Sequence, residues 1–519
     1  MTTILNLPSE LIADIVSYLD TDDVFSTRRS NRGLERASFA HFGKRFFRKK
    51  GYMITKESIE VLKAIAAHTE LRKYVQHIWL NPDLFLFATP SYVRDRLPYD
   101  DDESPCFQDH ETVEELTDED RLHYAAWASC MASHKELLHT GKLAMELSTA
   151  FSTLPNLKAL GMRRSEDHSP WGWQRLQEAT GYDPRVLGDI PSGAASDFAG
   201  PTYLYIALVK ALAASGAQIQ RFYTDAVEID SIPADTLPTE ILSEACKSVL
   251  YIELNATRAW INKDTYRILD HEGQPERIPL DVKISPDRYG TGLSRLMSAM
   301  PHLREIGLMI FPDRKQFHLV PPKPGVPGSW SSSYPYITLE RLSSSVNFRH
   351  LRRVKLEKFT ASASILLSVL KRSAASLTSL KIRDVRLITA NDELFAEPQN
   401  SRDPVDNKPW QHVFAFLATS CPSLNYLLLN HLSHDTGGIR FVADLPPQPP
   451  RDPNVPVLST IINAGDFVDY ENMSVDVRGL DLVQARVKQL VEGHWHNRNI
   501  FSYAMDETIW HTDTSDEEW

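Results

Sequence analysis

The chain has 519 residues, of which 42% are hydrophobic and 24% charged, a composition typical of a protein with a large folded core. Its formal net charge of −12 argues against a general nucleic-acid binder. We find no run of eighteen apolar residues, no signal-peptide pattern and only scattered cysteines, which together predict a cytoplasmic or nuclear protein without a membrane span.

The first fifty residues predict three short helices. Pro8 suits the first turn of a helix, and Glu10 favours the positive end of the helix dipole. Asp20 or Thr21 can cap the second helix, and the third is rich in phenylalanine. Three such helices rarely form a stable core alone, so part of their apolar surface should rest on the remaining chain or on another protein. The basic residues from Arg28 to Lys50 form either a solvated face or a surface for an acidic partner.

One spacing in this region is specific: Leu7-Pro8-x-Glu10-Leu11-x-x-x-Ile15-x-x-x-Leu19-x-x-x-Asp23-Val24. It resembles the F-box, a three-helix motif that docks onto the small Skp-type adaptor of cullin-based (SCF) ubiquitin ligases. The segment 28–32 departs from the usual family pattern, which often has Val-Cys-Arg and a Trp there. The resemblance implies an adaptor-binding surface made by Leu7, Pro8, Leu11, Ile12, Ile15, Leu19 and Val24. An ordinary amphipathic helix that caps a larger domain is the alternative.

Beyond residue 50 one arrangement recurs: an amphipathic helix, a short turn, and a strand with the pattern Leu-x-x-Leu-x-Leu or a close variant. The strands are predicted at 75–80, 154–160, 219–223, 249–254, 303–308, 351–356, 377–382 and 424–429. The helices are predicted at 59–67, 137–151, 203–215, 241–246, 293–300, 364–374 and 413–419. Leu351 and Leu377 are 26 residues apart, a spacing within the range of roughly 20–29 residues expected of leucine-rich repeats.

The leucines of this pattern point into a shared core, while the x residues point out along a parallel sheet. We therefore predict an α/β fold with an N-terminal three-helix F-box at 1–50 and an irregular leucine-rich-repeat-like βα solenoid, or horseshoe, at 51–479. Residues 480–519 are expected to form a capping helix and an acidic C-terminal tail. An acidic insertion at 94–121 and Pro-rich loops at 321–336 and 445–456 interrupt the solenoid. Fungal-type F-box proteins resemble this layout. A doubly wound enzyme is the competing interpretation, although no strand ends in a Gly-rich phosphate turn.

Catalytic patterns, cofactor sites and metal sites are not predicted. His134 and His139 are five residues apart, so on a helix they diverge by about 140° and cannot share a metal ion. For target contact we predict strand positions that point away from the core, with a merely solvated sheet face as the alternative. These residues are His77, Tyr251, Glu253, Arg353, Lys355, Lys381 and Tyr426.

The sequence thus predicts a non-catalytic substrate-recognition subunit of an SCF-type ubiquitin ligase. Its partners would be the Skp-type adaptor, the cullin through that adaptor, and an unknown target protein, but no nucleic acid and no membrane. Two alternatives remain open: a non-ligase F-box scaffold bound to the adaptor only, and an unrecognised enzyme with a βα fold.

Overall fold

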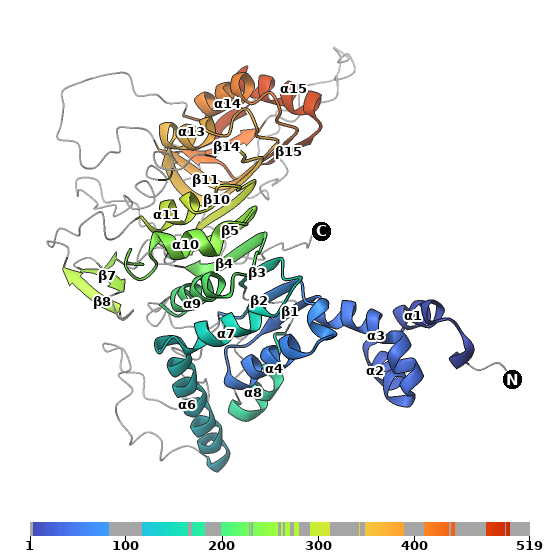
Figure 1. Ribbon diagram of the computed structural model, residues 1–519. Helices are drawn as coiled ribbons and strands as arrows, with labels where there is room; N and C mark the ends of the chain where they lie inside the picture. Colours follow the sequence, from blue (N-terminus) through green and yellow to red (C-terminus); the bar gives the residue numbers. More distant parts are fainter. Residues whose placement is uncertain are drawn as a thin grey trace. The chain divides into compact units, whose positions relative to one another are not determined.

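Figure 1 shows the computed structural model of the chain, which forms two compact units, Met1–Arg353 and Val354–Trp519. The structure describes residues 4–82, 117–163, 169–181, 199–227, 229, 232–257, 261–262, 265–269, 275–279, 291–311, 342, 348–388, 409–434, 437–441, 474–493 and 495–498. The predicted acidic insertion up to residue 116, both Pro-rich loops and the acidic tail lie outside these residues. The predicted domain boundaries stay predictions.

The first unit begins with three helices, α1 (Ser9–Ser17), α2 (Thr21–Ser30) and α3 (Arg32–Phe47), after a short 3-10 turn, η1 (Ile4–Asn6). Of the two possible caps for α2, Asp20 is the one used: its carboxylate accepts a hydrogen bond from the backbone N–H of Asp23 at 2.8 Å. Asn31 caps α3 in the same way, accepting from the N–H of Gly33 at 2.6 Å. Such side-chain acceptors satisfy amide donors that have no partner within the helix.

A parallel sheet follows, made by β1 (Lys49–Tyr52), β2 (His77–Leu80), β3 (Ala159–Met162), β4 (Arg221–Val227), β5 (Tyr251–Thr257) and β9 (Glu305–Phe311). These strands lie side by side in chain order. A doubly wound sheet reverses its strand order at a switch point, so these strands do not have that topology. The sequence did not predict β1, and Lys49 and Lys50 belong to this strand instead of the third helix.

Each new strand joins its neighbour through the same pair of hydrogen bonds. The carbonyl of Gln76, just before β2, accepts the N–H groups of Lys158 and Ala159 at 2.8 and 3.0 Å. Equivalent double acceptors are the carbonyls of Arg48, Lys158, Gln220, Leu250 and Arg304. The recurring sequence pattern therefore corresponds to a recurring backbone arrangement.

A layer of helices lies along one face of this sheet (Figure 1). It consists of α4 (Lys56–Ala67), α7 (Lys142–Ser152), α9 (Ala199–Ser215), α10 (Thr239–Cys246) and α11 (Gly292–Ser298), each next to the one before. Their leucines meet the inward residues of the strands, and both sets are buried. Examples are Leu62, Leu143, Leu147, Leu208, Leu242 and Leu296 from the helices, and Ile78, Leu160, Phe222, Ile252 and Ile306 from the strands.

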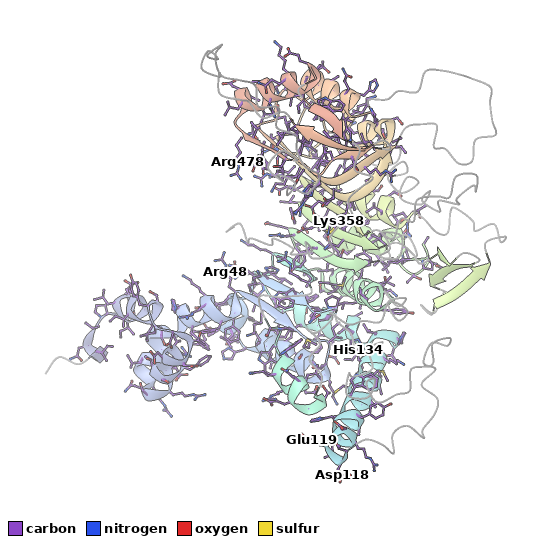
Figure 2. All side chains as sticks on the ribbon, turned by 180° about the vertical axis from the view of Figure 1, so that it is seen from behind. Arg48, Asp118, Glu119, His134, Lys358 and Arg478 are labelled. Carbon is purple, nitrogen blue, oxygen red and sulfur yellow. The ribbon has the colours of Figure 1, made fainter. Side chains whose placement is uncertain are left out.

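The single helix predicted at 137–151 is in fact two helices. α6 (Asp118–His139) starts with Asp118 and Glu119 and carries His134 near its other end (Figure 2). Gly141, with φ of +73°, separates it from α7. A left-handed residue cannot continue a helix, and glycine adopts it without steric cost. α6 packs with α8 (Trp173–Thr180) around a second small core of Met53, Trp127, Trp173 and Leu176.

Shorter elements complete the first unit: a 3-10 turn, η2 (Leu71–Lys73), precedes β2, and β6 (Ile261–Asn262), β7 (Thr265–Leu269) and β8 (Pro275–Pro279) form a small antiparallel sheet. Among the helices that the structure describes, none is long and apolar enough to cross a membrane.

The second unit has a mixed sheet, in which β10 (Arg353–Ser362) adjoins β11 (Ser379–Ile388), and β11 pairs in parallel with β12 (Tyr426–Asn430). β15 (Ser474–Arg478) then adds to β12 in the antiparallel sense. The helices are α13 (Ala363–Lys371), α14 (Pro409–Ser420) and α15 (Leu480–Val491), and α15 packs on α14. β13 (Ser433–His434), β14 (Gly437–Phe441) and β16 (Trp495–Arg498) form a further antiparallel run. The sequence predicted α15 but not the antiparallel strands.

Candidate functional site

The three N-terminal helices enclose a small core of their own. Its buried residues are Ile12 and Val16 from α1, Val24 from α2 and Leu34 from α3. Leu19, Ala37, Phe42 and Phe46 pack around them and are partly buried. Two of the predicted adaptor contacts, Ile12 and Val24, are thus 4% and 0% exposed and serve the core of these helices.

A stripe of large apolar side chains lies on the outside of the same helices. Leu7, Leu11 and Ile15 are 37%, 48% and 40% exposed and follow one another at intervals of four residues, with Leu7 just before α1 and the other two on it. Ile4, Tyr18 and Phe25 are exposed nearby in the sequence. Pro8 is also exposed, and Leu19 is half-buried. We call Leu7, Leu11 and Ile15 the apolar stripe; contiguous exposed apolar residues of this kind mark interaction sites.

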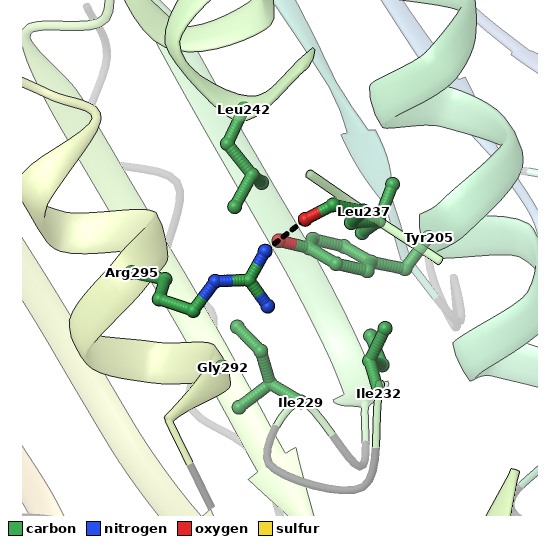
Figure 3. A pocket seen from close by; sticks show the side chains of 7 residues that line it. All are labelled: Tyr205, Ile229, Ile232, Leu237, Leu242, Gly292 and Arg295. Atoms are coloured by element: carbon green, nitrogen blue, oxygen red, sulfur yellow. Dashed lines mark hydrogen bonds between the residues drawn. The ribbon is translucent and has the colours of Figure 1, made fainter. Parts of the chain in front are cut away.

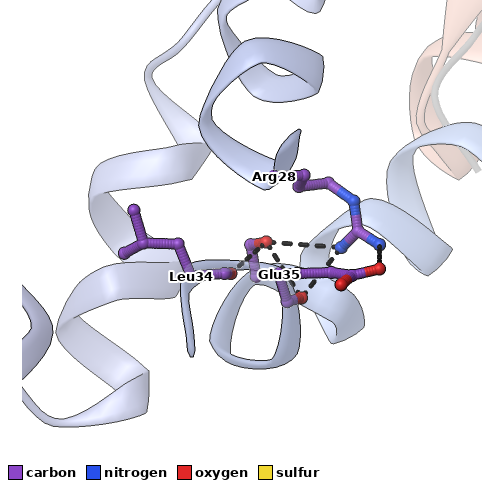
Figure 4. Close-up of polar contacts among 4 residues, drawn as sticks. Arg28, Leu34 and Glu35 are labelled. Carbon is purple, nitrogen blue, oxygen red and sulfur yellow. Dashed lines mark hydrogen bonds and ion pairs between the residues drawn. The ribbon is translucent and has the colours of Figure 1, made fainter. Parts of the chain in front are cut away.

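Arg28 joins α2 to α3, a role that the sequence did not predict. Its guanidinium carbon lies 3.9 Å from the centre of the Phe42 ring. Nη1 donates to the carbonyl of Glu35 at 3.0 Å and to Oγ of Ser38 at 3.3 Å, while Nη2 is 3.7 Å from the Glu35 carboxylate (Figure 4). Burial lowers the pKa of Arg28, and Glu35 opposes that shift. One member of the predicted basic face therefore stabilises this three-helix fold.

Comparison with known families decides what these helices are. The F-box domain family model matches residues 4–38, which run from η1 into α3. The chain carries an F-box domain. F-box domains bind Skp-type adaptors, and proteins that carry them are typically non-catalytic subunits of ubiquitin ligases. No curated protein matches the chain.

A second candidate surface is the open face, by which we mean the side of the strands opposite the helix layer. In the first unit, two rows of residues cross it in register. One row contains Lys49, His77, Ala159, Arg221, Tyr251 and Glu305, and the other Gly51, Trp79, Gly161, Tyr223, Glu253 and Gly307.

Glycines alternate with aromatic residues in the second row. A Cβ atom on Gly51 would lie 2.1 Å from the nearest atom of the Trp79 ring, and one on Gly161 would lie 2.6 Å from the ring of Tyr223. Each aromatic ring thus covers the backbone of the strand before it. Trp79 and Tyr223 are only 3% and 6% exposed, so they form a closed surface.

Polar side chains pair with one another across this surface. Nε2 of His77 is 2.6 Å from the Tyr223 hydroxyl, and the Tyr251 hydroxyl donates to Glu253 at 3.0 Å. The guanidinium carbon of Arg221 lies 4.4 Å from the centre of the Tyr251 ring. Burial raises the pKa of Tyr223 and of Tyr251. At one edge, Nη1 of Arg353 is 3.3 Å from the Glu305 carboxylate.

The open face of the second unit is more basic. Lys381, Arg383 and Tyr426 lie on β11 and β12, and Arg478 on β15. Nζ of Lys381 lies 5.4 Å from the centre of the Tyr426 ring, and the guanidinium carbon of Arg478 lies 5.1 Å from it. Lys355, on β10, forms an ion pair of 3.1 Å with Glu357, which is almost buried.

The structure places all seven predicted target-binding residues on strands, with their side chains partly or fully exposed. It brings together Tyr251 with Glu253 and Lys381 with Tyr426. The leucine pattern did not single out Trp79, Arg221 and Tyr223, although they occupy the same alternating positions as His77. It also missed Arg478, because β15 was not predicted. Whether any of these residues contacts a target, or the stripe an adaptor, stays a prediction.

Two buried thiols and one pocket bear on possible catalysis. Burial raises the pKa of Cys246 to about 12 and that of Cys421 to about 11, so both stay protonated at neutral pH. A pocket lies between Tyr205, Ile229, Ile232, Leu237, Leu242, Gly292 and Arg295 (Figure 3). Arg295 already donates to the carbonyls of Ala234 and Leu237, and the remaining lining is mainly apolar. This pocket has the composition of a packing defect more than that of a reaction site.

Proposed function

We propose that this F-box protein is a substrate-recognition subunit of an SCF-type ubiquitin ligase. Its F-box would bind the Skp-type adaptor and, through it, the cullin, and its sheet units would bind a target protein. The chemistry would occur in another subunit, which the complex brings close to the target. We expect it to act in the cytoplasm or the nucleus. The observation that carries this proposal is the apolar stripe on a domain matched as an F-box.

The proposed adaptor binding is supported by the two sets of apolar residues in the F-box, one buried and one exposed. Ile12, Val16 and Val24 are needed for the core and are buried, whereas Leu7, Leu11 and Ile15 contribute little to it. Burying a leucine or isoleucine side chain is worth about 1.5–3 kcal/mol. The stripe would therefore provide the main adaptor contact, with Pro8 and Leu19 at its margins.

The target-binding part rests on the sheet. Parallel strands in chain order with helices on one face are what stacked strand–helix repeats produce, and we propose that they form a degenerate leucine-rich-repeat-like solenoid. In such an arrangement the open face displays side chains from many strands. His77, Tyr251, Glu253 and Arg353 would contribute to target contact from the first unit, and Lys355, Lys381 and Tyr426 from the second.

Co-purification of the full chain with the adaptor and cullin tests this proposal. The variant Leu11→Asp/Ile15→Asp places two charges on the apolar stripe and should lose both partners. Leu122→Asp/Leu482→Asp is the matched control, because both leucines are exposed outside the F-box, at 72% and 64%. If wild type brings down neither partner, or the two variants behave alike, the proposal is wrong. Adaptor without cullin would indicate the non-ligase scaffold.

A further inference from the structure

The two open faces differ in how their charges are used. In the first unit, the basic residues Arg221 and Arg353 lie next to Glu253 and Glu305, at 4.0 and 3.3 Å. The open face of the second unit carries four basic residues, Lys355, Lys381, Arg383 and Arg478, against three acidic ones, Glu357, Asp384 and Asp476. This local excess of positive charge stands against a net charge of −12 for the whole chain.

The acidic residues of the second unit do not offset that excess. Glu357 is 7% exposed and forms a close ion pair with Lys355. Asp476 lies 3.9 Å from Arg478, but the side chain of Arg478 is 72% exposed, and exposed pairs of this kind contribute little. Lys381 contacts the Tyr426 ring and Arg383 lies 3.6 Å from Asp384. A carboxylate of a binding partner would be attracted by Lys381, Arg383 and Arg478.

On the open face of the second unit, Tyr426 lies close to two of these cations. Lys381 and Arg478 approach the same ring from neighbouring strands on either side of β12. The separation of their charged groups cannot exceed the sum of their distances to that ring centre, 5.4 and 5.1 Å. Residues two apart in an extended peptide point to the same side and lie about 7 Å from each other. Two carboxylates at this spacing could therefore reach both cations, one on either side of the Tyr426 ring.

Left-handed backbone positions lie on β10, on β11 and directly after β12. Lys358, Asp384 and His431 have φ of 55°, 53° and 49°, although none is glycine. Nδ1 of His431 lies 3.0 Å from the Asp384 carboxylate. Figure 2 labels Lys358 and Arg478, which come from β10 and β15 of this sheet. Such strained residues persist where the surrounding structure holds them, so the face is preformed.

We infer that the open face of the second unit binds an extended acidic segment of the target protein, with carboxylates two residues apart on Lys381 and Arg478. This inference rests on the proposed role in target recognition and names the chemistry of the target. Nucleic acid fits less well, because Tyr426 provides one ring instead of a series of stacking platforms.

Fluorescence anisotropy with the full chain tests the inference. The probe is a labelled twelve-residue peptide of repeated Glu-Ala, and the comparison peptide has Gln in place of every Glu. We expect saturable binding of the acidic peptide, at least tenfold weaker binding of the Gln peptide, and weakening with salt. No saturable binding, or equal binding of both peptides, would overturn the inference.

Charge-reversal variants locate the binding. Lys381→Glu/Arg478→Glu should weaken acidic-peptide binding at least tenfold. Lys142→Glu/Lys247→Glu changes the net charge equally at exposed positions of other surface helices and should leave binding unchanged. Equal loss in both variants, retention in the first, or tighter binding of a twelve-nucleotide oligouridylate would contradict the inference. Adaptor capture by the same variants is a separate readout, so a failed ligase proposal can be told from a failed peptide site.

Discussion

The indole of Trp79 covers the backbone of Gly51 on the neighbouring parallel strand, so closely that a methyl group on Gly51 would overlap the ring. Trp79 is 3% exposed although it lies on the open face. This pair covers the open face at β1, the strand that follows α3 of the F-box directly.

This packing predicts that Gly51→Ala destabilises the protein by about 1–3 kcal/mol, the usual cost of overpacking. Gly307→Ala is the matched control: it lies in the same row, but its new methyl group would come closest to the flexible side chain of Glu253, at 3.3 Å. Urea unfolding of both variants makes the comparison. Equal stability of the two variants would show that the contact between Trp79 and Gly51 does not constrain the sheet.

Arg28→Ala should destabilise the F-box by about 1–3 kcal/mol, because it removes hydrogen bonds to Glu35 and Ser38 and the stacking on Phe42. Arg29→Ala, at an exposed neighbouring position, should have no measurable effect. Hydrogen exchange of the amides in α2 and α3 provides the measurement. Unchanged exchange in the Arg28 variant would place this arginine among the solvated basic residues.

Neighbouring residues of α1 should separate binding from folding. Leu11→Ala should weaken adaptor binding about tenfold or more and leave the melting temperature nearly unchanged, since Leu11 is 48% exposed. Ile12→Ala should lower stability by about 2–5 kcal/mol, because Ile12 is buried in the F-box core. Titration calorimetry with the purified adaptor and thermal unfolding measure the two effects. If Ile12→Ala weakened adaptor binding and Leu11→Ala lowered stability instead, α1 would present its other side to the adaptor.

His134 should make stability depend on pH. Burial lowers its pKa from 6.5 to about 4, while Nδ1 lies 2.8 Å from the carbonyl of Ile54. Since the unfolded chain takes up this proton first, stability is full above pH 6.5 and falls as the pH drops towards 4, by about 3 kcal/mol in total. In His134→Asn the amide can keep the hydrogen bond without titrating, so this part of the pH dependence should disappear. A parallel decline in both proteins would assign the effect to other groups.

The sequence predicted the repeated elements well, because each depends on a local pattern. The strands at Leu154, Leu303 and Leu424 follow from leucine spacing alone, and the structure confirms them a few residues further along. The break at Gly141 was missed because a lone glycine between two helical patterns does not by itself indicate a left-handed turn. β1 was missed because four residues with two lysines carry almost no strand signal.

The surfaces were harder to predict than the elements. Heptad-like spacing places Leu11 and Ile12 in the same apolar set, and only packing against α2 and α3 shows which of them is exposed. On the sheet, alternation identified His77 and Tyr251 but could not show that Tyr223 reaches back to His77 over Gly161. Contacts between distant segments, such as Arg478 with Tyr426, depend on strand pairing that no local pattern contains.

We propose that one protein holds a target and presents it for ubiquitin transfer. The most direct test captures the full chain from cells, as wild type and as Leu11→Asp/Ile15→Asp, and measures both the proteins bound and their attached ubiquitin. The account predicts at least one protein captured equally by both but carrying ubiquitin only with wild type. If every captured protein carries the same ubiquitin with either chain, the protein is not a ligase subunit that acts through this F-box.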